Sequence, residues 1–406
     1  MKRKFFGAVC AAGVIAAVFF AVGCDSSSGG SGGSHIAVPD YLLVEGTTIV
    51  GCVKDRLPAE LKIPEGITGI LGFAFTGCTG LKNLTIPVSV VTIHDAAFDN
   101  CPNLATVVYT GTLAQWCYIF QDWNLLCHAN TVRLEGSNIE NLKEMEHIEI
   151  PSGVTQINDG AFRYLENLKS VTIPNTVESI GFCAFESCTG IEEIVIPDSV
   201  YSIGALAFGK YYPNDEKDMS LKKVTIGKNV KTIGVGAFRV LKNLEEVIIP
   251  SDSVTEIICR SAFSNCSSLA SIEIPKSVTR IEEGAFANCI SLEEVIIPSG
   301  SVTEIICEAA FFGCTSLASI EIPKNVTRIE EMAFVNCISL EEVKFADTEN
   351  WYQVYFDTPI DVSDPGVNAS ELNTSTFTIS FSGGEEWISA ASWGYTGGIC
   401  KKDNGV

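Results

Sequence analysis

The stretch "IEEGAFANCISLEEVIIP", residues 281–298, carries the pattern that decides the fold. Its Ala-Phe pair ends three residues ahead of Cys289, and apolar residues follow at 292, 295 and 297 before Pro298 closes the stretch. This spacing occurs ten times along the chain, with phenylalanine at 75, 98, 162, 185, 208, 238, 263, 286, 311 and 334. Most intervals are 23 residues, and a fixed period in the twenties is typical of a solenoid, in which each unit buries its apolar side against its neighbours.

The repeat unit reads I-P-x-x-V-T-x-I-x-x-x-A-F-x-x-C-x-x-L-x-x-V-x-I-P. Its L-x-x-V-x-I segment predicts a short strand with one buried face, and the proline that follows removes a backbone donor and ends the strand. V-T-x-I predicts a second extended segment on another side of the coil. Ala-Phe-x-x-Cys has apolar residues at helical spacing and predicts one helical or 3₁₀ turn. The sequence therefore predicts an α/β repeat solenoid with a parallel β-sheet face.

Several segments depart from the regular period. One interval is 30 residues long and includes "YYPNDEKD", and a long gap separates Phe98 from Phe162. Residues 107–134 lack the Ala-Phe pair but begin and end on strand-like segments, so we interpret them as an aromatic variant repeat. The start of that segment is echoed at 343–356, which is expected to close a solenoid spanning 41–356. Residues 357–406 carry no repeat, and the sequence leaves open whether they form a C-terminal cap or a tail.

The cysteine of the repeat is predicted to be part of the core. The position holds cysteine at 78, 101, 188, 266, 289, 314 and 337, but Leu165, Tyr211 and Leu241 in the other three copies. A metal ligand or a nucleophile would not be exchanged for leucine, whereas a buried slot would accept it, since free cysteine behaves as a small hydrophobe. We therefore expect reduced thiols in the core. Whether any of the cysteines form disulfides is left open.

The first residues are typical of an exported lipoprotein. A basic start precedes an apolar run from Phe5 to Val22, and "AVGC" followed by "DSSSGGSGGS" resembles a lipoprotein cleavage box and a flexible tether. We interpret residues 1–23 as a signal peptide, Cys24 as the lipid attachment site and 24–40 as the tether. A membrane-spanning anchor is the alternative. Asp25 resembles an inner-membrane retention signal, so the sequence leaves the choice of membrane open, with the outer membrane or cell surface favoured.

The charge of the chain excludes nucleic-acid binding. The formal net charge is −22, and loss of the three basic residues at 2–4 with the signal peptide would leave 24 basic against 49 acidic side chains, about −25. Such a balance repels phosphate backbones and weakly favours basic partners.

The sequence contains no pattern of residues that indicates an enzyme, a cofactor or a metal site. The chain has only four histidines, and Cys127-His128 are adjacent, which is poor geometry for a nucleophile and its base. Glutamate pairs such as 245–246, 293–294 and 341–342 recur because the repeat recurs, whereas a glycosidase needs two carboxylates in an unrepeated cleft. We therefore expect a non-catalytic protein.

Binding is expected on the exposed face of the sheet. In each strand the residue between the last two core positions points outward. We call these residues the outward row: Thr85, Val108, Glu149, Thr172, Val195, Thr225, Ile248, Glu273, Ile296, Glu321 and Lys344. We hypothesise that this partly apolar strip, with Glu245, Glu246, Glu293 and Glu294 beside it, docks an extended protein partner. The alternative is that its β-branched residues only reflect strand propensity.

With this repeat established, the chain resembles the BspA-like leucine-rich-repeat proteins over roughly residues 57–355, as in "IPNTVESIGFCAFESCTGIEEIVIP" at 173–197. The resemblance implies a right-handed leucine-rich-repeat array. It also implies a protein or lipoprotein on the surface of a host-associated bacterium that adheres to matrix proteins, host cells or other bacteria. A periplasm-facing scaffolding lipoprotein is the alternative. The family's motif residues build the core, so no binding residue can be transferred.

Overall fold

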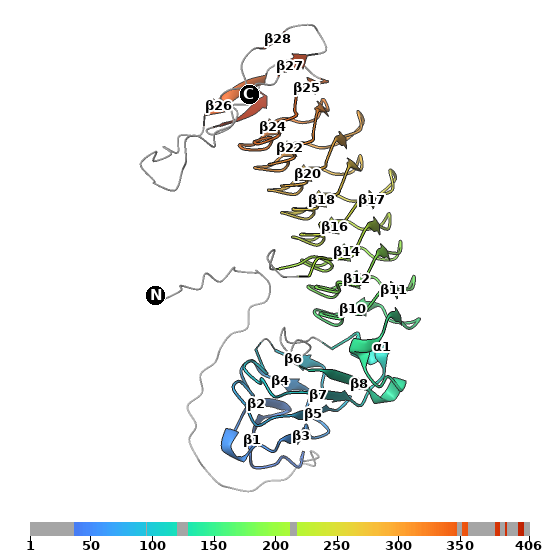
Figure 1. Cartoon of the computed structure of the whole chain (residues 1–406), viewed down its shortest axis with the longest axis vertical. Coiled ribbons are helices and arrows are strands. Elements are labelled where there is room, and N and C mark those ends of the chain that lie inside the picture. The colour runs from blue at the N-terminus through green and yellow to red at the C-terminus, as the bar shows by residue number, and fades with distance from the viewer. Residues whose placement is uncertain are drawn as a thin grey trace, which may run out of the picture. The chain divides into compact units, whose positions relative to one another are not determined.

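The computed structural model describes residues 36–94, 96–119, 129–211 and 217–346, together with the backbone of four further strands between 351 and 401. All of these residues belong to one compact unit, Ile36–Val406. Successive turns of its chain follow one another as a coil of short strands (Figure 1). The predicted repeat solenoid is confirmed, with strands as the dominant element and few helices among the described residues.

From residue 154 onward the V-T-x-I segments form one ladder, which we call the side sheet. Each contributes a two-residue strand with a buried isoleucine, and neighbouring strands pair in parallel and in register, as Ile180 does with Ile203. Its repeat strands are β10 (Gln156–Ile157), β12 (Ser179–Ile180), β14 (Ser202–Ile203), β16 (Thr232–Ile233), β18 (Ile257–Ile258), β20 (Arg280–Ile281), β22 (Ile305–Ile306) and β24 (Arg328–Ile329). A similar ladder at the start of the unit joins β1 (Leu42–Glu45), β2 (Thr48–Cys52), β4 (Gly69–Ile70) and β6 (Thr92–Ile93).

The L-x-x-V-x-I segments form the second set, which we call the front strands. Their central residue is buried and its neighbours point outward, as the period of two requires. They are β3 (Glu60–Lys62), β5 (Asn83–Ile86), β7 (Thr106–Tyr109), β8 (Thr131–Leu134), β9 (His147–Glu149), β11 (Ser170–Thr172), β13 (Glu193–Val195), β15 (Lys223–Thr225), β17 (Glu246–Ile248), β19 (Ser271–Glu273), β21 (Glu294–Ile296), β23 (Ser319–Ile322) and β25 (Glu342–Phe345).

Strands that follow the repeats extend both sets. From the front strands, β25 pairs in parallel with β27 (Thr378–Phe381), which pairs with β28 (Glu386–Trp387). In the side sheet, β24 pairs antiparallel with β29 (Gly397–Lys401), which pairs with β26 (Trp351–Tyr355). The variant repeat at 107–134 and the segment at 343–356 that echoes its start differ in structure, since Trp116 ends a helix and Trp351 begins a strand.

The Ala-Phe-x-x-Cys segments form single hydrogen-bonded turns. In the first copy the N–H of Cys78 donates to the Phe75 carbonyl three residues before it, at 3.1 Å, which is the 3₁₀ pattern. The Phe75 N–H donates instead to the next turn of the coil, to the Ala97 carbonyl at 2.8 Å. Among the described residues, the assigned helices lie outside these segments: α1 (Leu113–Trp116), η1 (Lys54–Arg56), η2 (Glu135–Ser137) and η3 (Leu142–Glu144).

Left-handed residues at both ends explain why these turns stay short. The residue before the alanine has φ between 53° and 67° in all ten copies: Phe73, Ala96, Gly160, Cys183, Leu206, Gly236, Ser261, Gly284, Ala309 and Met332. A second left-handed residue follows two positions after the phenylalanine in most copies, and there it is often glycine or asparagine, as at Gly77 and Asn288. An L-residue in this conformation costs about 1–2 kcal/mol and ends a helical run.

The phenylalanines form a continuous stack through the core. From Phe162 to Phe334 the centroids of neighbouring rings lie 5.2–5.6 Å apart with interplanar angles of 15° or less. Phe75 and Phe98 form a separate stacked pair at 5.0 Å. Such offset stacks add to the free energy gained by removing the rings from water.

The core cysteines do more than fill space. Their thiols donate to the carbonyl of the phenylalanine one turn earlier at 3.0–3.2 Å: Cys101 to Phe75, Cys188 to Phe162, Cys266 to Phe238, Cys289 to Phe263, Cys314 to Phe286 and Cys337 to Phe311. Leu165 and Leu241 are fully buried, which confirms the apolar slot. Tyr211 does not fill it, because the 30-residue interval carries it to the surface, where it is 42% exposed.

The aromatic variant repeat bridges the long gap between Phe98 and Phe162. Trp116, at the end of α1, is fully buried, and its Nε1 donates to the Ala161 carbonyl at 2.7 Å. In regular repeats the corresponding alanine carbonyl accepts the backbone N–H of the phenylalanine one repeat earlier, as Ala184 does from Phe162. An indole N–H therefore replaces a backbone N–H, and the chain passes this irregular turn with its hydrogen bond retained.

A buried ion pair also occupies the core. Arg163 Nε contacts Glu186 Oε2, and both side chains are almost fully buried. The other carboxylate oxygen, Oε1, accepts the N–H of Tyr211 at 3.0 Å. Apolar residues such as Ala287 and Val335 occupy the matching position after the phenylalanine in later repeats, so the pair is a local feature of these turns.

The left-handed position yields a paired test of backbone strain. Ala309→Gly should stabilise the protein by about 0.5–1 kcal/mol, because relief of left-handed strain exceeds the entropy cost of glycine. Gly284→Ala, at the same position one repeat earlier, should destabilise it by a similar amount, since an added Cβ meets only ordinary contacts at 3.6 and 3.7 Å. Urea midpoints from circular dichroism measure both effects. Shifts of the same sign in the two variants would contradict this explanation.

The buried pair predicts strong non-additivity. Glu186→Ala should cost about 3–5 kcal/mol because it leaves the Arg163 guanidinium buried without its carboxylate. The double variant Arg163→Ala/Glu186→Ala should be more stable than Glu186→Ala alone, since no buried charge is left without a partner. A urea denaturation series measures the cycle. A double variant less stable than the single one would show that the pair is not held by its charges.

Candidate binding surface

The outward row lies where the sequence predicts it. Among its members Val195 is 54% exposed and Ile296 41% exposed, while Ile248 and Thr225 are half-buried. Thr172, Glu273 and Glu321 are exposed. The residue before each of them is buried. Side chains of a strand point alternately inward and outward, so the strands that contribute to the core also expose this row.

Strand register places these residues side by side. Val195 pairs with Thr225, and Thr225 pairs with Ile248. Glu273 pairs with Ile296 in the next ladder, and Glu321 with Lys344 in the one after. The front strands are divided into several ladders, and two of the breaks follow β17 and β21, where the 25-residue intervals insert two extra residues.

A second row on the same strands was only partly anticipated. The residue before each buried central position also faces outward, and it includes Glu193, Lys223, Glu246, Ser271 and Glu294. We call it the second row. Lys223 Nζ lies 2.7 Å from Glu246 Oε2, and this carboxylate raises the pKa of Lys223. The period of two in the strand segments was the signal that could have identified the full row.

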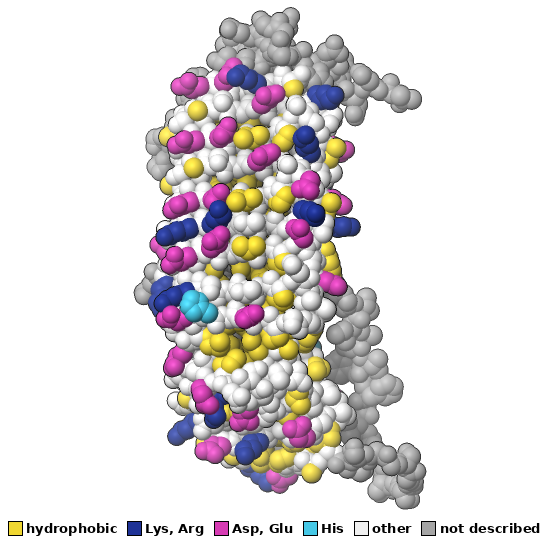
Figure 2. Space-filling model, turned by 90° about the vertical axis from the view of Figure 1, so that its right-hand side faces the viewer, with side chains coloured by type: hydrophobic (Ala, Val, Ile, Leu, Met, Phe, Trp, Pro, Cys, Tyr) yellow, Lys and Arg dark blue, Asp and Glu magenta, His cyan; other side chains and the backbone are white. Residues whose placement is uncertain are grey.

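The face is therefore acidic with apolar side chains interspersed. Glu245, Glu246, Glu293 and Glu294 are all exposed, as predicted. Figure 2 shows this mixture on the side of the molecule where β11 and β17 lie in Figure 1, with carboxylates and hydrophobic side chains distributed over successive turns. The surface can offer an extended partner both apolar contacts and acceptors for basic groups.

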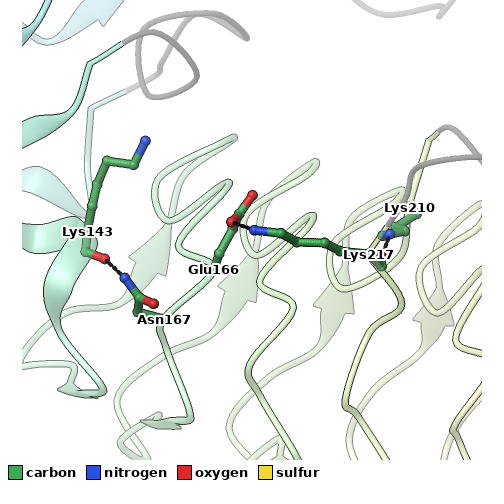
Figure 3. Close-up of polar contacts among 5 residues, drawn as sticks. All are labelled: Lys143, Glu166, Asn167, Lys210 and Lys217. Carbon is green, nitrogen blue, oxygen red and sulfur yellow. Dashed lines mark hydrogen bonds and ion pairs between the residues drawn. The ribbon is translucent and has the colours of Figure 1, made fainter.

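The residues on either side of 212–216, within the 30-residue interval, contact earlier turns of the coil. Lys217 Nζ contacts Glu166 Oε2, which belongs to the repeat of Phe162, two repeats before the insertion leaves the coil (Figure 3). Lys210 Nζ donates to the Lys217 carbonyl, so the two ends of the insertion are joined. Neighbouring turns are tied in a similar way, because Asn167 Nδ2 donates to the Lys143 carbonyl at 2.9 Å.

The buried thiols lie in surroundings unsuited to catalysis. Burial raises the pKa of Cys188 and of Cys266 to about 12, so each stays protonated at neutral pH. Among the residues that the structure describes, no group of three or more His, Cys, Asp or Glu could hold a metal ion. Also within that part of the chain, no helix has the length and apolar character needed to span a membrane.

Some sequence predictions fall outside the described residues. They include the signal peptide at 1–23, the lipid site Cys24, most of the tether at 24–40 and the Cys127-His128 pair. These remain predictions from the sequence. The roles assigned to the outward row as a binding site also remain predictions, although the positions of its residues are now described.

Comparison with solved structures finds bacterial leucine-rich-repeat proteins. A leucine rich cell surface protein from Faecalibacterium prausnitzii is 24% identical, with 77% of this chain and 89% of that chain covered and a TM-score of 0.44. A leucine-rich repeat protein from Bacteroides ovatus is 22% identical, with 76% and 91% covered and a TM-score of 0.38. One from Eubacterium ventriosum is 20% identical, with 70% and 83% covered and a TM-score of 0.38. No curated protein matches the chain.

The repeat itself is recognised by a family model. The model described as "BspA type Leucine rich repeat region (6 copies)" matches residues 56–131, 136–257, 216–305 and 243–358. These ranges contain every Ala-Phe copy and residues 107–131 of the aromatic variant repeat, and they cover more than half of the chain. The chain therefore belongs to the family of BspA-type leucine-rich-repeat proteins.

Proposed function

We propose that the protein is a non-catalytic cell-surface binding protein that adheres to a host extracellular-matrix protein, a host cell or another bacterium. Family membership supports a protein-binding role in general terms. The observation that carries the proposal is the outward row, on which Val195 and Ile296 are 54% and 41% exposed between carboxylates. Aliphatic side chains that recur among threonine and glutamate along this row offer repeated apolar contacts for an extended segment.

The chemistry of the face favours a partner with basic and apolar side chains. The chain carries 49 acidic against 27 basic residues, and the second row adds Glu193, Glu246 and Glu294 beside the apolar positions. Opposite charge on the partner accelerates encounter and makes binding depend on salt. Contact with the aliphatic row then supplies affinity that salt does not screen.

A lipid on Cys24 would hold this face outside the cell. We propose export by the segment at 1–23, attachment at Cys24 and presentation of the repeats on a tether to residue 40, with 357–406 as a C-terminal cap or tail. The alternative is a periplasm-facing scaffolding lipoprotein, which Asp25 favours. Protease treatment of intact cells separates the two locations, because a periplasmic protein would survive it.

The binding surface is tested by adding charge to its apolar positions. In Ile248→Lys/Ile296→Lys both substitutions place an ammonium where the partner is proposed to make apolar contact. We expect at least a tenfold loss of affinity for any extracellular-matrix protein that the wild-type chain captures from a purified panel. Surface plasmon resonance measures the affinity, and circular dichroism checks the fold.

The chain offers a matched control. Val254→Lys/Val302→Lys adds the same charge at valines that are 42% and 46% exposed in the same block of repeats but outside the front strands. This control should bind like the wild type. Equal binding by wild type and both variants, or a wild-type chain that captures no matrix protein and does not attach to cells, would refute the proposed surface.

A further inference from the structure

The first turn of the coil contains a pair of thiols that differs from the other core cysteines. In six later copies the core thiol donates to the phenylalanine carbonyl of the preceding turn. Cys78 belongs to the first copy, so no Ala-Phe turn precedes it. Its Sγ lies 3.5 Å from the Sγ of Cys52, the last residue of β2. The thiol ladder thus begins with a sulfur–sulfur contact.

We propose that Cys52 and Cys78 are a disulfide-forming pair that covalently joins the first hairpin of the unit to the first repeat. Their sulfur atoms are already in contact, and a disulfide needs them about 2.05 Å apart. Among the described residues, this is the only pair of cysteines shown with sulfur atoms in hydrogen-bonding contact. The next thiol along, that of Cys101, is directed instead at the Phe75 carbonyl at 3.2 Å.

The two cysteines are suited to different roles in the exchange. Cys52 is partly exposed, whereas Cys78 is 4% exposed. The hydrogen bond between the two thiols lowers the pKa of Cys52, and the nearby ammonium of Lys54 acts in the same direction. The same hydrogen bond and burial raise the pKa of Cys78. Cys52 is therefore the attacking thiol and Cys78 the resolving thiol.

The oxidant is a disulfide of the environment, either a small-molecule disulfide or the disulfide of a thiol oxidase. The Cys52 thiolate attacks one of its sulfur atoms, its S–S bond breaks, and one thiol leaves with the proton from Cys52. Cys78 then loses its proton and attacks the Cys52 sulfur, which releases the second thiol. Two electrons and two protons pass from the cysteine pair to the oxidant, which is reduced to two thiols.

The position explains what the bond would do. An end repeat lacks a neighbour on one side, so the array opens most easily from its ends. A Cys52–Cys78 bond closes a segment with a sequence separation of 26 residues across this end. Loop closure of that size should reduce local opening of the first turns on the order of 100-fold. In the cell the pair meets an oxidising compartment only if the chain is exported as proposed, but the chemistry can be tested without cells or a binding partner.

The experiment exposes the purified, reduced chain to oxidised glutathione at pH 8 under native conditions. Free thiols are then blocked with N-ethylmaleimide, and peptides are mapped by mass spectrometry. We expect the tryptic peptide 63–82, which contains Cys78, to be joined to a peptide that ends at Lys54. Hydrogen exchange should show slower opening of β2 and β4 in the oxidised protein, and a reductant should reverse the change.

Three variants complete the test. Cys78→Ala should leave Cys52 as a stable glutathione adduct, because the resolving thiol is missing. Cys52→Ser should leave the remaining core thiols reduced, and the matched control Cys101→Ser, one repeat further on, should still form the Cys52–Cys78 link. The proposal is overturned if the folded wild-type chain keeps its glutathione adduct on Cys52 without resolution, or if both cysteines carry N-ethylmaleimide after oxidation.

Discussion

The structure depends on the stacking of each turn directly on the next, because a single turn has no interior of its own. Phenylalanine rings 5.2–5.6 Å apart run from Phe162 to Phe334, and their backbone N–H groups donate to the following turn. The slot beside each ring takes an apolar side chain, which is leucine at Leu165 and Leu241 and cysteine in most other copies. Cysteine fits that space and also supplies a thiol that donates to the phenylalanine carbonyl of the preceding turn, which leucine cannot do.

Irregular turns are accommodated by replacing one hydrogen bond with another. The Trp116 indole supplies the donor that the Ala161 carbonyl receives from a backbone N–H in regular repeats. On either side of 212–216, Lys217 contacts Glu166 two repeats away and the N–H of Tyr211 donates to Glu186. The array therefore tolerates changes of length because the core contacts between turns persist on either side of them.

The core and the proposed binding surface use alternate residues of the same strands. The buried central positions repeat with little variation, so they cannot distinguish one partner from another. The outward positions change from valine to threonine, isoleucine and glutamate along successive turns. The described turns make a long repeated surface, which suits the proposed binding of an extended partner. The thiol pair at the first turn would reinforce the end of the array that stacking alone leaves open.

The sequence by itself determined the repeat, its two strands, the buried phenylalanines and the outward row, because each depends on local periodicity. The left-handed residues around the Ala-Phe pair were not predicted, because Leu206 and Met332 adopt this conformation as well as the glycines and asparagines that favour it. Only the tertiary structure decided which atoms meet between turns. Contacts such as those of Trp116 with Ala161, Lys217 with Glu166 and Cys52 with Cys78 join residues far apart in the chain. Their partners are set by the stacking of whole turns, which no local pattern specifies.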